Sequence, residues 1–134
     1  MVRPAGPEEG PQVTHPLSQL GYDVDVTAVE TAISQGDDVL VAELDKEMVG
    51  LLTFGSRYQL HRNGKVTTID ALVVDESRRS RGIGAAPVQH LVAMAKWEGW
   101  ESIELHSQVS RVAARRFYER EGFEVTSNFF RKTL

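Results

Sequence analysis

The sequence predicts an α/β (α+β) domain with a mixed, mostly antiparallel sheet, a central parallel βαβ pair and helices on both faces of the sheet. The expected elements follow one another in the order α-α-β-β-β-α-β-α-β-β. Residues 71–74 form an apolar run without alternation, which is typical of a strand buried on both faces. A helix and another strand follow this run, so the two strands should be parallel and joined by a right-handed crossover.

Two helices and a hairpin are expected in the first part of the chain. Glycines close the segments 8–20 and 25–35, which predicts two short helices. The pattern then changes to that of strands at Val39–Leu44 and Met48–Phe54, on either side of the polar turn 45–47. Two strands around a short polar turn form a β-hairpin.

The middle of the chain contains the crossover. Residues 55–64 are expected to form a loop, before a strand at Val66–Val74. The next helix reaches about Trp97 and carries apolar residues at the i, i+3, i+4 and i+7 spacing of one buried face. A strand at Ser102–His106 and a helix at about 110–120 follow.

The chain is expected to end in two strands, Phe123–Val125 and Phe129–Thr133. Neighbouring residues of a strand point to opposite faces, so either Phe129 or Phe130 should turn its ring away from the core. An exposed aromatic ring on an edge strand favours contact with a second copy of the chain. We therefore expect a homodimer.

Length and composition exclude several classes of function. The 134 residues suffice for one domain, 1–134, and the absence of cysteine excludes a disulfide scaffold, a thiolate-held metal and a cysteine nucleophile. A net charge of −4 disfavours nucleic-acid binding, and the four histidines show no metal-ligand spacing. We therefore expect neither a nucleic-acid partner nor a bound metal. The chain has no apolar run of membrane-span length, and residues 1–20 do not read as a signal peptide. We expect a cytoplasmic protein with no membrane partner.

The segment between the buried strand and the following helix is basic and contains Gly82-Ile83-Gly84. A glycine-rich turn at a helix start presents backbone N–H groups and the positive end of the helix dipole, and both favour phosphate. A dinucleotide-binding fingerprint would need a glycine at position 87, where this chain has Pro87. A Walker A loop would need a glycine followed by Lys-Ser or Lys-Thr, and the chain has no such run. Pro87 is tolerated if the helix begins at Gly84, because it then lies in the first turn.

The run Arg79-Ser80-Arg81-Gly82-Ile83-Gly84 fits the pattern [RQ]-x-x-G-x-[GA], the pyrophosphate loop of acyl-CoA-dependent N-acyltransferases. Ala114–Phe123 is similar to a second signature, A-x-x-F-Y-x-x-x-G-F. With both motifs in this order, the chain resembles the GNAT superfamily of N-acetyltransferases over nearly its whole length. Residues 110–134 are also similar to a subgroup that includes aminoalkylphosphonate N-acetyltransferase. A glycine-rich turn without a ligand is the alternative interpretation of the loop.

The resemblance implies a site for acetyl-CoA along the central strand. The pantetheine arm would pair with this strand, and the N–H of Leu72 would point at the thioester oxygen, where negative charge develops. Backbone amides from Ser80 to Ala85 would hold the pyrophosphate. The implied cofactor-binding residues are Leu72, Val73, Val74, Arg79, Ser80, Arg81, Gly82, Ile83, Gly84 and Ala85.

The resemblance also implies which groups move protons. Tyr118 matches the family tyrosine that protonates the leaving thiolate, although a tyrosine here also suits a core. The attacking amine has to lose a proton. Asp70, Glu104, His106 and solvent are the candidates for accepting it, and we favour Asp70.

The expected function is therefore that of an acetyl-CoA-dependent N-acetyltransferase. It would move an acetyl group to a primary amine of a small molecule or peptide by direct attack in a ternary complex. The alternative is a non-catalytic acyl-CoA-binding or regulatory module with the same fold. The sequence does not name the acceptor amine.

Overall fold

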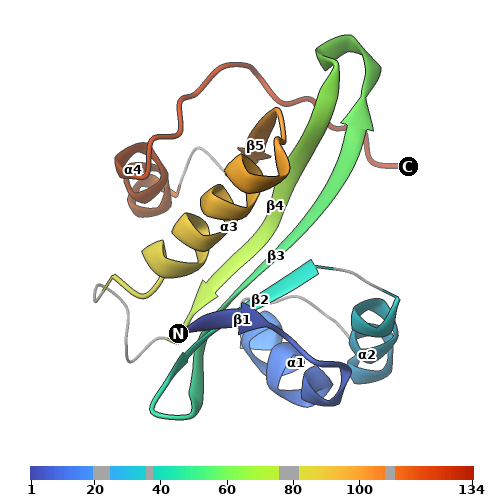
Figure 1. The fold of residues 1–134 in the computed structure, drawn as a ribbon, viewed down its shortest axis with the longest axis vertical. Coiled ribbons are helices and arrows are strands. Elements are labelled where there is room, and N and C mark those ends of the chain that lie inside the picture. Colours follow the sequence, from blue (N-terminus) through green and yellow to red (C-terminus); the bar gives the residue numbers. More distant parts are fainter. Residues whose placement is uncertain (20–24, 36–37, 76–81, 108–110) are drawn as a thin grey trace. The chain divides into compact units, whose positions relative to one another are not determined.

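The structure, a computed structural model, describes residues 1–19, 25–35, 38–75, 82–107 and 111–134 (Figure 1). These residues form two compact units, residues 1–104 and residues 105–134. The first unit holds nearly all of the sheet and its hydrophobic core. None of the helices described is long and apolar enough to cross a membrane.

The chain begins with a strand that the sequence did not predict, β1 (Val2–Pro4), which pairs antiparallel with the next strand of the sheet. The helix expected at 8–20 is a 3-10 turn, η1 (Pro7–Glu9), followed by α1 (Gly10–Gln19). The helix expected at 25–35 is α2 (Val26–Ser34). Asp25 caps α2, because its side chain accepts a hydrogen bond from the Thr27 N–H.

The predicted hairpin is confirmed as β2 (Asp38–Leu44) and β3 (Glu47–Gln59). Asp45 and Lys46 both have positive φ angles, 52° and 67°, as a two-residue hairpin turn requires. The loop expected at 55–64 is wrong. Gly55–Gln59 continues β3, because each of these residues pairs with β4 (Gly64–Val74), and only the turn η2 (Leu60–Arg62) and Asn63 separate the two strands.

The sheet has the order β1-β2-β3-β4-β5 and carries buried side chains on both faces. On one face, Val41, Leu51 and Val73 pack against Val13 of α1. Leu40 and Leu52 alternate to the opposite face and are also buried. The helix α3 (Ala85–Glu98), whose buried side chains include Val88 and Leu91, contacts β1, β2 and β3.

The predicted parallel pair with its connecting helix is confirmed. The helix α3 joins β4 to β5 (Ser102–Leu105), and the two strands are parallel neighbours. Pro87 is the third residue of α3, in the first turn, where no intrahelical hydrogen bond is lost. The proline therefore leaves the start of this helix intact.

The second unit contains α4 (Val112–Arg120) and the C-terminal segment. The two strands expected at 123–125 and 129–133 are not formed: residues 123–134 carry no strand. Phe129 instead makes two side-chain contacts. Its ring lies against the His106 ring, with 4.1 Å between the two centroids, and the Arg131 guanidinium lies 5.6 Å from the centroid of the Phe129 ring. The prediction of two C-terminal strands is therefore wrong.

Candidate functional site

A β-bulge interrupts the pairing of β3 with β4 at Asp70. Thr53 lies opposite Ala71 and Phe54 lies opposite Ile69, so Asp70 has no residue opposite it in β3. The extra residue bends the strand and redirects its side chains. Asp70 is exposed at this bend, two residues before Leu72.

The backbone of β4 beyond the bulge has a defined direction for each N–H. The Asp75 N–H donates to Val49 of β3, at 2.8 Å. Successive N–H groups of a strand point to alternate edges, so those of Leu72 and Val74 point away from β3, toward the edge where β5 lies. The sequence-based assignment named these two amides for the pantetheine arm.

The strand β5 does not reach this part of β4. The Glu101 N–H donates to Lys65 of β4 at 2.8 Å, which fixes the register between the two strands. By that register β5, which ends at Leu105, stops beside about Ile69. Leu72 and Val74 therefore lie past the end of β5, where an extended ligand can pair with their N–H groups.

The glycine-rich turn, residues 82–84, directly precedes α3. Gly82 has a φ angle of +74°, which glycine adopts without strain, and a side chain at this position would enter open space. Gly84 caps α3 without a side-chain hydrogen bond, so the first N–H groups of α3, from Ala85 on, have no side-chain cap. A Cβ on Gly50 of β3 would lie 3.5 Å from the Ile83 side chain, so Ile83 anchors the turn against the sheet. Arg79, Ser80 and Arg81 lie outside the described residues.

Tyr118 lies in α4, within the second unit. Its ring makes edge-on contacts with Phe117 and Phe123, with centroids 5.1 and 5.7 Å apart. Burial raises the pKa of the Tyr118 phenol, and the nearby Arg111 charge opposes this shift. The phenol thus stays protonated throughout the physiological pH range, as a proton donor must.

The other two candidate bases, Glu104 and His106, lie outside β4. Glu104 accepts a hydrogen bond from Arg62 at 2.6 Å, and this contact raises the pKa of Arg62. His106 stacks on Phe129. Of the three side chains, Asp70 is the one on the bulged strand that leads to Leu72.

An open groove of about 380 Å³ extends from Asp70 along β3 and β4. Its walls include Arg57, a residue that sequence reasoning missed because it placed residue 57 in a loop. Arg57 is recognised as a wall of the groove from its pairing with Val66, and this pairing is known only once the register of the two strands is known.

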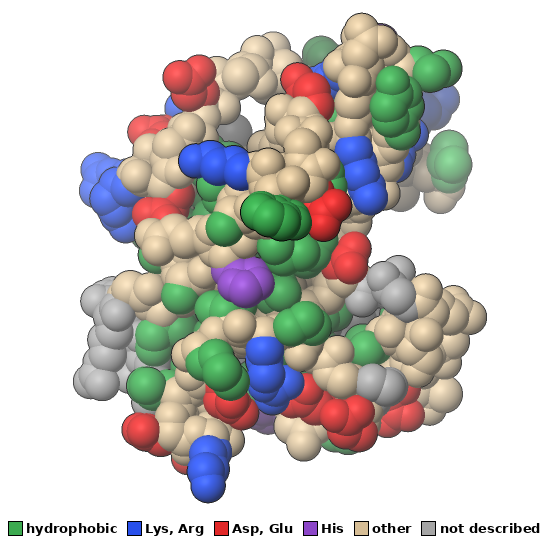
Figure 2. Space-filling model, viewed as in Figure 1, with side chains coloured by type: hydrophobic (Ala, Val, Ile, Leu, Met, Phe, Trp, Pro, Cys, Tyr) green, Lys and Arg blue, Asp and Glu red, His purple; other side chains and the backbone are tan. Residues whose placement is uncertain are grey.

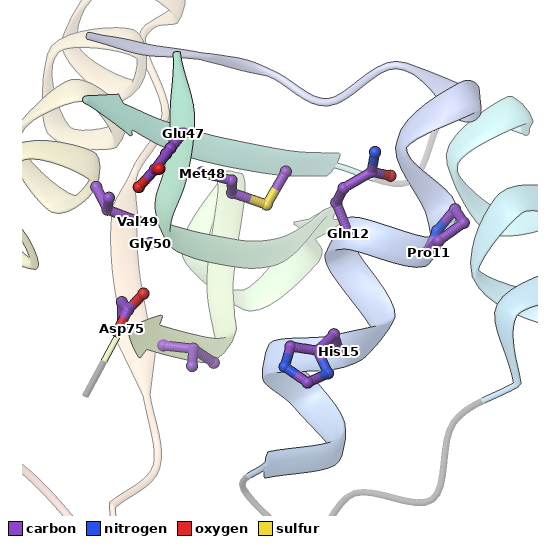
Figure 3. A pocket seen from close by; sticks show the side chains of 9 residues that line it. Pro11, Gln12, His15, Glu47, Met48, Val49, Gly50 and Asp75 are labelled. Atoms are coloured by element: carbon purple, nitrogen blue, oxygen red, sulfur yellow. The ribbon is translucent and has the colours of Figure 1, made fainter. Parts of the chain in front are cut away.

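A second cavity, of about 550 Å³, lies between α1 and the ends of β3 and β4. Figure 3 shows Gln12 and His15 projecting from α1, with Glu47 at the start of β3 and Asp75 directly after the end of β4. None of these residues was singled out in the sequence, because they come from three separate elements. In Figure 2, acidic side chains gather in the lower part of the view, where Figure 1 places α1, α2 and the β2–β3 turn. Such a surface attracts cations, including protonated amines.

The family of the chain follows from comparison with known proteins. Residues 9–123 match the acetyltransferase (GNAT) family. The chain belongs to this GNAT family.

Relatives of this GNAT protein are named for different acceptors. It is 32% identical over 88 residues to the aminoalkylphosphonate N-acetyltransferase of Salmonella typhimurium, covering 66% of this chain and 57% of that protein. It is 36% identical over 120 residues to a probable glucosamine 6-phosphate N-acetyltransferase of Oryza sativa subsp. japonica, covering 80% of this chain and 70% of that protein. The chain thus spans little more than half the length of the Salmonella protein.

Solved structures support the fold assignment. An aminoglycoside acetyltransferase from an uncultured soil metagenomic sample, in complex with sisomicin, aligns with a TM-score of 0.85 at 19% identity. The alignment covers 100% of this chain and 95% of the other. At this level of identity the likeness concerns the fold alone.

Proposed function

We propose that this GNAT protein is an acetyl-CoA-dependent N-acetyltransferase that acts on a primary amine of a small molecule or peptide. The observation that carries the proposal is the course of β4: a bulge at Asp70, then Leu72 and Val74 past the end of β5, then the turn at Gly82. This course suits a thioester held by strand-like pairing with its phosphates at a helix start. Family membership supports the same activity.

In the proposed reaction the amine attacks the thioester carbonyl carbon directly. The Leu72 N–H donates to the carbonyl oxygen as negative charge develops on it. Asp70 accepts the proton that the amine loses, directly or through water. The carbon–sulfur bond then breaks, and the thiolate takes a proton from Tyr118. Tyr118 is given this role because it occupies the tyrosine position of the second family motif.

The proposed acetyl-CoA site continues into the glycine-rich turn. The pantetheine arm would pair with the strand around Val73, and the pyrophosphate would lie on the amides of Gly82 to Ala85. Open space over Gly82 supports this placement. Arg79, Ser80 and Arg81, which precede the turn in sequence, complete the proposed set.

The remaining proposals concern the whole chain. We propose that residues 1–134 act as one acetyltransferase domain, because both family motifs contribute groups to the reaction. We propose also that the protein is cytoplasmic and forms a homodimer. The names of the two curated relatives suggest that its acceptor is an amine that also carries a phosphorus oxyanion.

A screen of acceptor amines tests the proposed activity. Purified protein is mixed with acetyl-CoA and aminoalkylphosphonates, amino sugars, aminoglycosides, polyamines or peptides, and the release of free thiol is followed. We expect thiol release that depends on at least one amine. Tight acetyl-CoA binding without turnover on any amine would instead support the non-catalytic acyl-CoA-binding or regulatory module.

A further inference from the structure

The groove beside Asp70 lies on one face of the β3–β4 hairpin and is lined by Gly55, Ser56, Arg57, Val66, Thr68 and Asp70. Gly55 pairs with Thr68, and Arg57 pairs with Val66, so the two strands contribute side chains to the same face. By the alternation of β3 this is also the face on which Leu51 packs against α1. Its volume, about 380 Å³, falls within the range of small-molecule sites.

The two ends of the groove carry opposite charges. Asp70 lies at the bulge, next to the proposed thioester position, and Arg57 lies opposite Val66, four residues earlier on β4. Four residues of a strand span about 13 Å of backbone, and this is an upper scale for the separation of the two charges, because the long Arg57 side chain can reach along the groove that both residues line. The distance suits a compact molecule with a charged group at each end.

Arg57 differs from the paired arginines of the described chain. Arg3, Arg62 and Arg115 each form an ion pair with a glutamate. Arg57 forms no hydrogen bond or ion pair with any residue that the structure describes, and its side chain is exposed. A guanidinium without a carboxylate partner at the end of a groove is a binding group for a carboxylate, phosphate or phosphonate.

We propose that this groove is the acceptor site and that it selects small amines bearing an anionic group, with the ammonium at Asp70 and the anion on Arg57. The proposal rests on the proposed acetyltransferase function and adds the chemical class of the acceptor and the residue that recognises it. The geometry places the amine next to the strand that would hold the thioester. An uncharged tail would leave the Arg57 charge without its ligand.

Gly55 keeps the middle of the groove open. A Cβ at this position meets no atom within 4 Å, and Gly55 does not have the positive φ angle that would strain another residue. A larger side chain at position 55 therefore fills the groove without disturbing the strand. This gives a steric probe that is independent of charge.

Matched acceptors test the proposal. We compare 3-aminopropylphosphonate, 4-aminobutyrate, n-butylamine and 1,4-diaminobutane, which share a short alkyl chain and end in a phosphonate, a carboxylate, a methyl or a second ammonium group. Acetyl transfer is measured as kcat/KM, and acceptor binding to the acetyl-CoA-loaded protein is measured separately by NMR titration. We expect both anionic acceptors to be favoured at least tenfold over n-butylamine, with the diamine poorest. The ratio between phosphonate and carboxylate identifies the anion that the groove prefers.

Four variants, one of them a control, accompany these acceptors. Arg57→Gln should lower kcat/KM tenfold or more for the anionic acceptors and less than twofold for n-butylamine, whereas Arg57→Lys should restore part of the loss. Gly55→Leu should weaken the binding of every acceptor and leave acetyl-CoA affinity unchanged. Lys96→Gln removes an exposed positive charge from the last turn of α3 and serves as the control, with no expected effect.

The outcomes separate this proposal from the activity itself. Equal effects of Arg57→Gln on all four acceptors, or no effect on any, would overturn the assignment of Arg57 while acetyl transfer stands. Acceptor binding without turnover would contradict the enzyme but retain the groove. A wild-type protein that neither binds nor acetylates the anionic amines at millimolar concentration would refute the proposal outright.

Discussion

Arg3 connects three elements at the start of the chain. From β1 its guanidinium donates to both carboxylate oxygens of Glu9 in η1, at 2.7 and 2.9 Å, and to Glu43 in β2 at 3.3 Å. The hydrogen bonds from Arg3 lower the pKa of Glu9 from 4.5 to about 2. The short strand β1 thus has an anchor beyond its three pairs with β2.

We expect Arg3→Gln to lower the free energy of unfolding by about 1.5–3 kcal/mol at pH 7, the usual contribution of hydrogen bonds to a charged group. A carboxyl with a lowered pKa stabilises the fold above its unfolded value of 4.5, and this contribution is lost as the pH falls toward 2. The difference between wild type and variant should therefore shrink below pH 4.5. Urea unfolding between pH 7 and pH 3 measures it.

Arg62→Gln provides the comparison for this prediction. Arg62 pairs with Glu104, but both side chains are more than a third exposed, so solvent screens their attraction. We therefore expect Arg62→Gln to lower the free energy of unfolding much less than Arg3→Gln does. Equal losses for the two variants would show that the bidentate contact of Arg3 has no special role.

Tyr118 is the residue on which the proposed chemistry depends most directly. We expect Tyr118→Phe to lower kcat about 10²–10⁴-fold with little change in KM, because the phenol acts on the leaving group only in the transition state. Tyr58→Phe removes the hydroxyl of an exposed tyrosine and should leave kcat unchanged. Activity of Tyr118→Phe within twofold of wild type, with the fold intact, would reduce Tyr118 to a packing residue.

At the level of elements, Gly82 and Gly99 lie near opposite ends of α3 with nearly the same positive φ angle. Their φ angles are +74° and +72°, and in both cases a side chain would meet open space. Substitution of either glycine carries a similar cost of about 1–2 kcal/mol from the left-handed backbone. A difference in function between the two variants therefore reports on the ligand.

We expect Gly82→Asp to weaken acetyl-CoA binding tenfold or more, about 1.4 kcal/mol, because it places negative charge beside the pyrophosphate. Gly99→Asp should lower stability by a comparable amount and leave the affinity unchanged. Calorimetric titration with acetyl-CoA, together with thermal unfolding of both variants, measures these effects. A folded Gly82→Asp protein with wild-type affinity would refute the assignment of the phosphate loop.

The elements that sequence predicted well are those specified by local pattern. The α2 and α3 helices and the β2–β3 turn have their signals within a few residues. The strand segment Gly55–Gln59 was missed because glycine, serine and glutamine have low strand propensity, and it forms only through its ladder with β4. The strand β1 was missed for the same reason: three residues including a proline form a strand here through pairing with β2 and the Arg3 contacts.

The residues of the candidate site likewise fall into those specified by a local pattern and those specified by strand pairing. The glycine-rich turn and the tyrosine motif are contiguous in sequence and could be identified from it. The bulge at Asp70 and the position of Arg57 depend on the register between β3 and β4, which no local pattern encodes. The residues proposed to recognise the acceptor therefore became visible only in the structure.

For the whole molecule, the remaining question is its assembly. The strand β5 lies at one end of the sheet order, and an edge strand offers unpaired backbone groups to a second copy. The C-terminal segment also exposes apolar side chains, with Phe129 58% and Phe130 88% exposed. These observations favour association even though the segment forms no strand of its own.

We expect a homodimer at micromolar concentration, with twice the 14.9 kDa mass of one chain. Phe130→Asp should shift the equilibrium toward the monomer, because it places a charge where an apolar contact is expected. Leu60→Asp, at another exposed apolar residue, should leave the dimer intact. Light scattering over a hundredfold range of concentration measures the mass, and a wild-type value that stays at 14.9 kDa throughout would exclude the dimer.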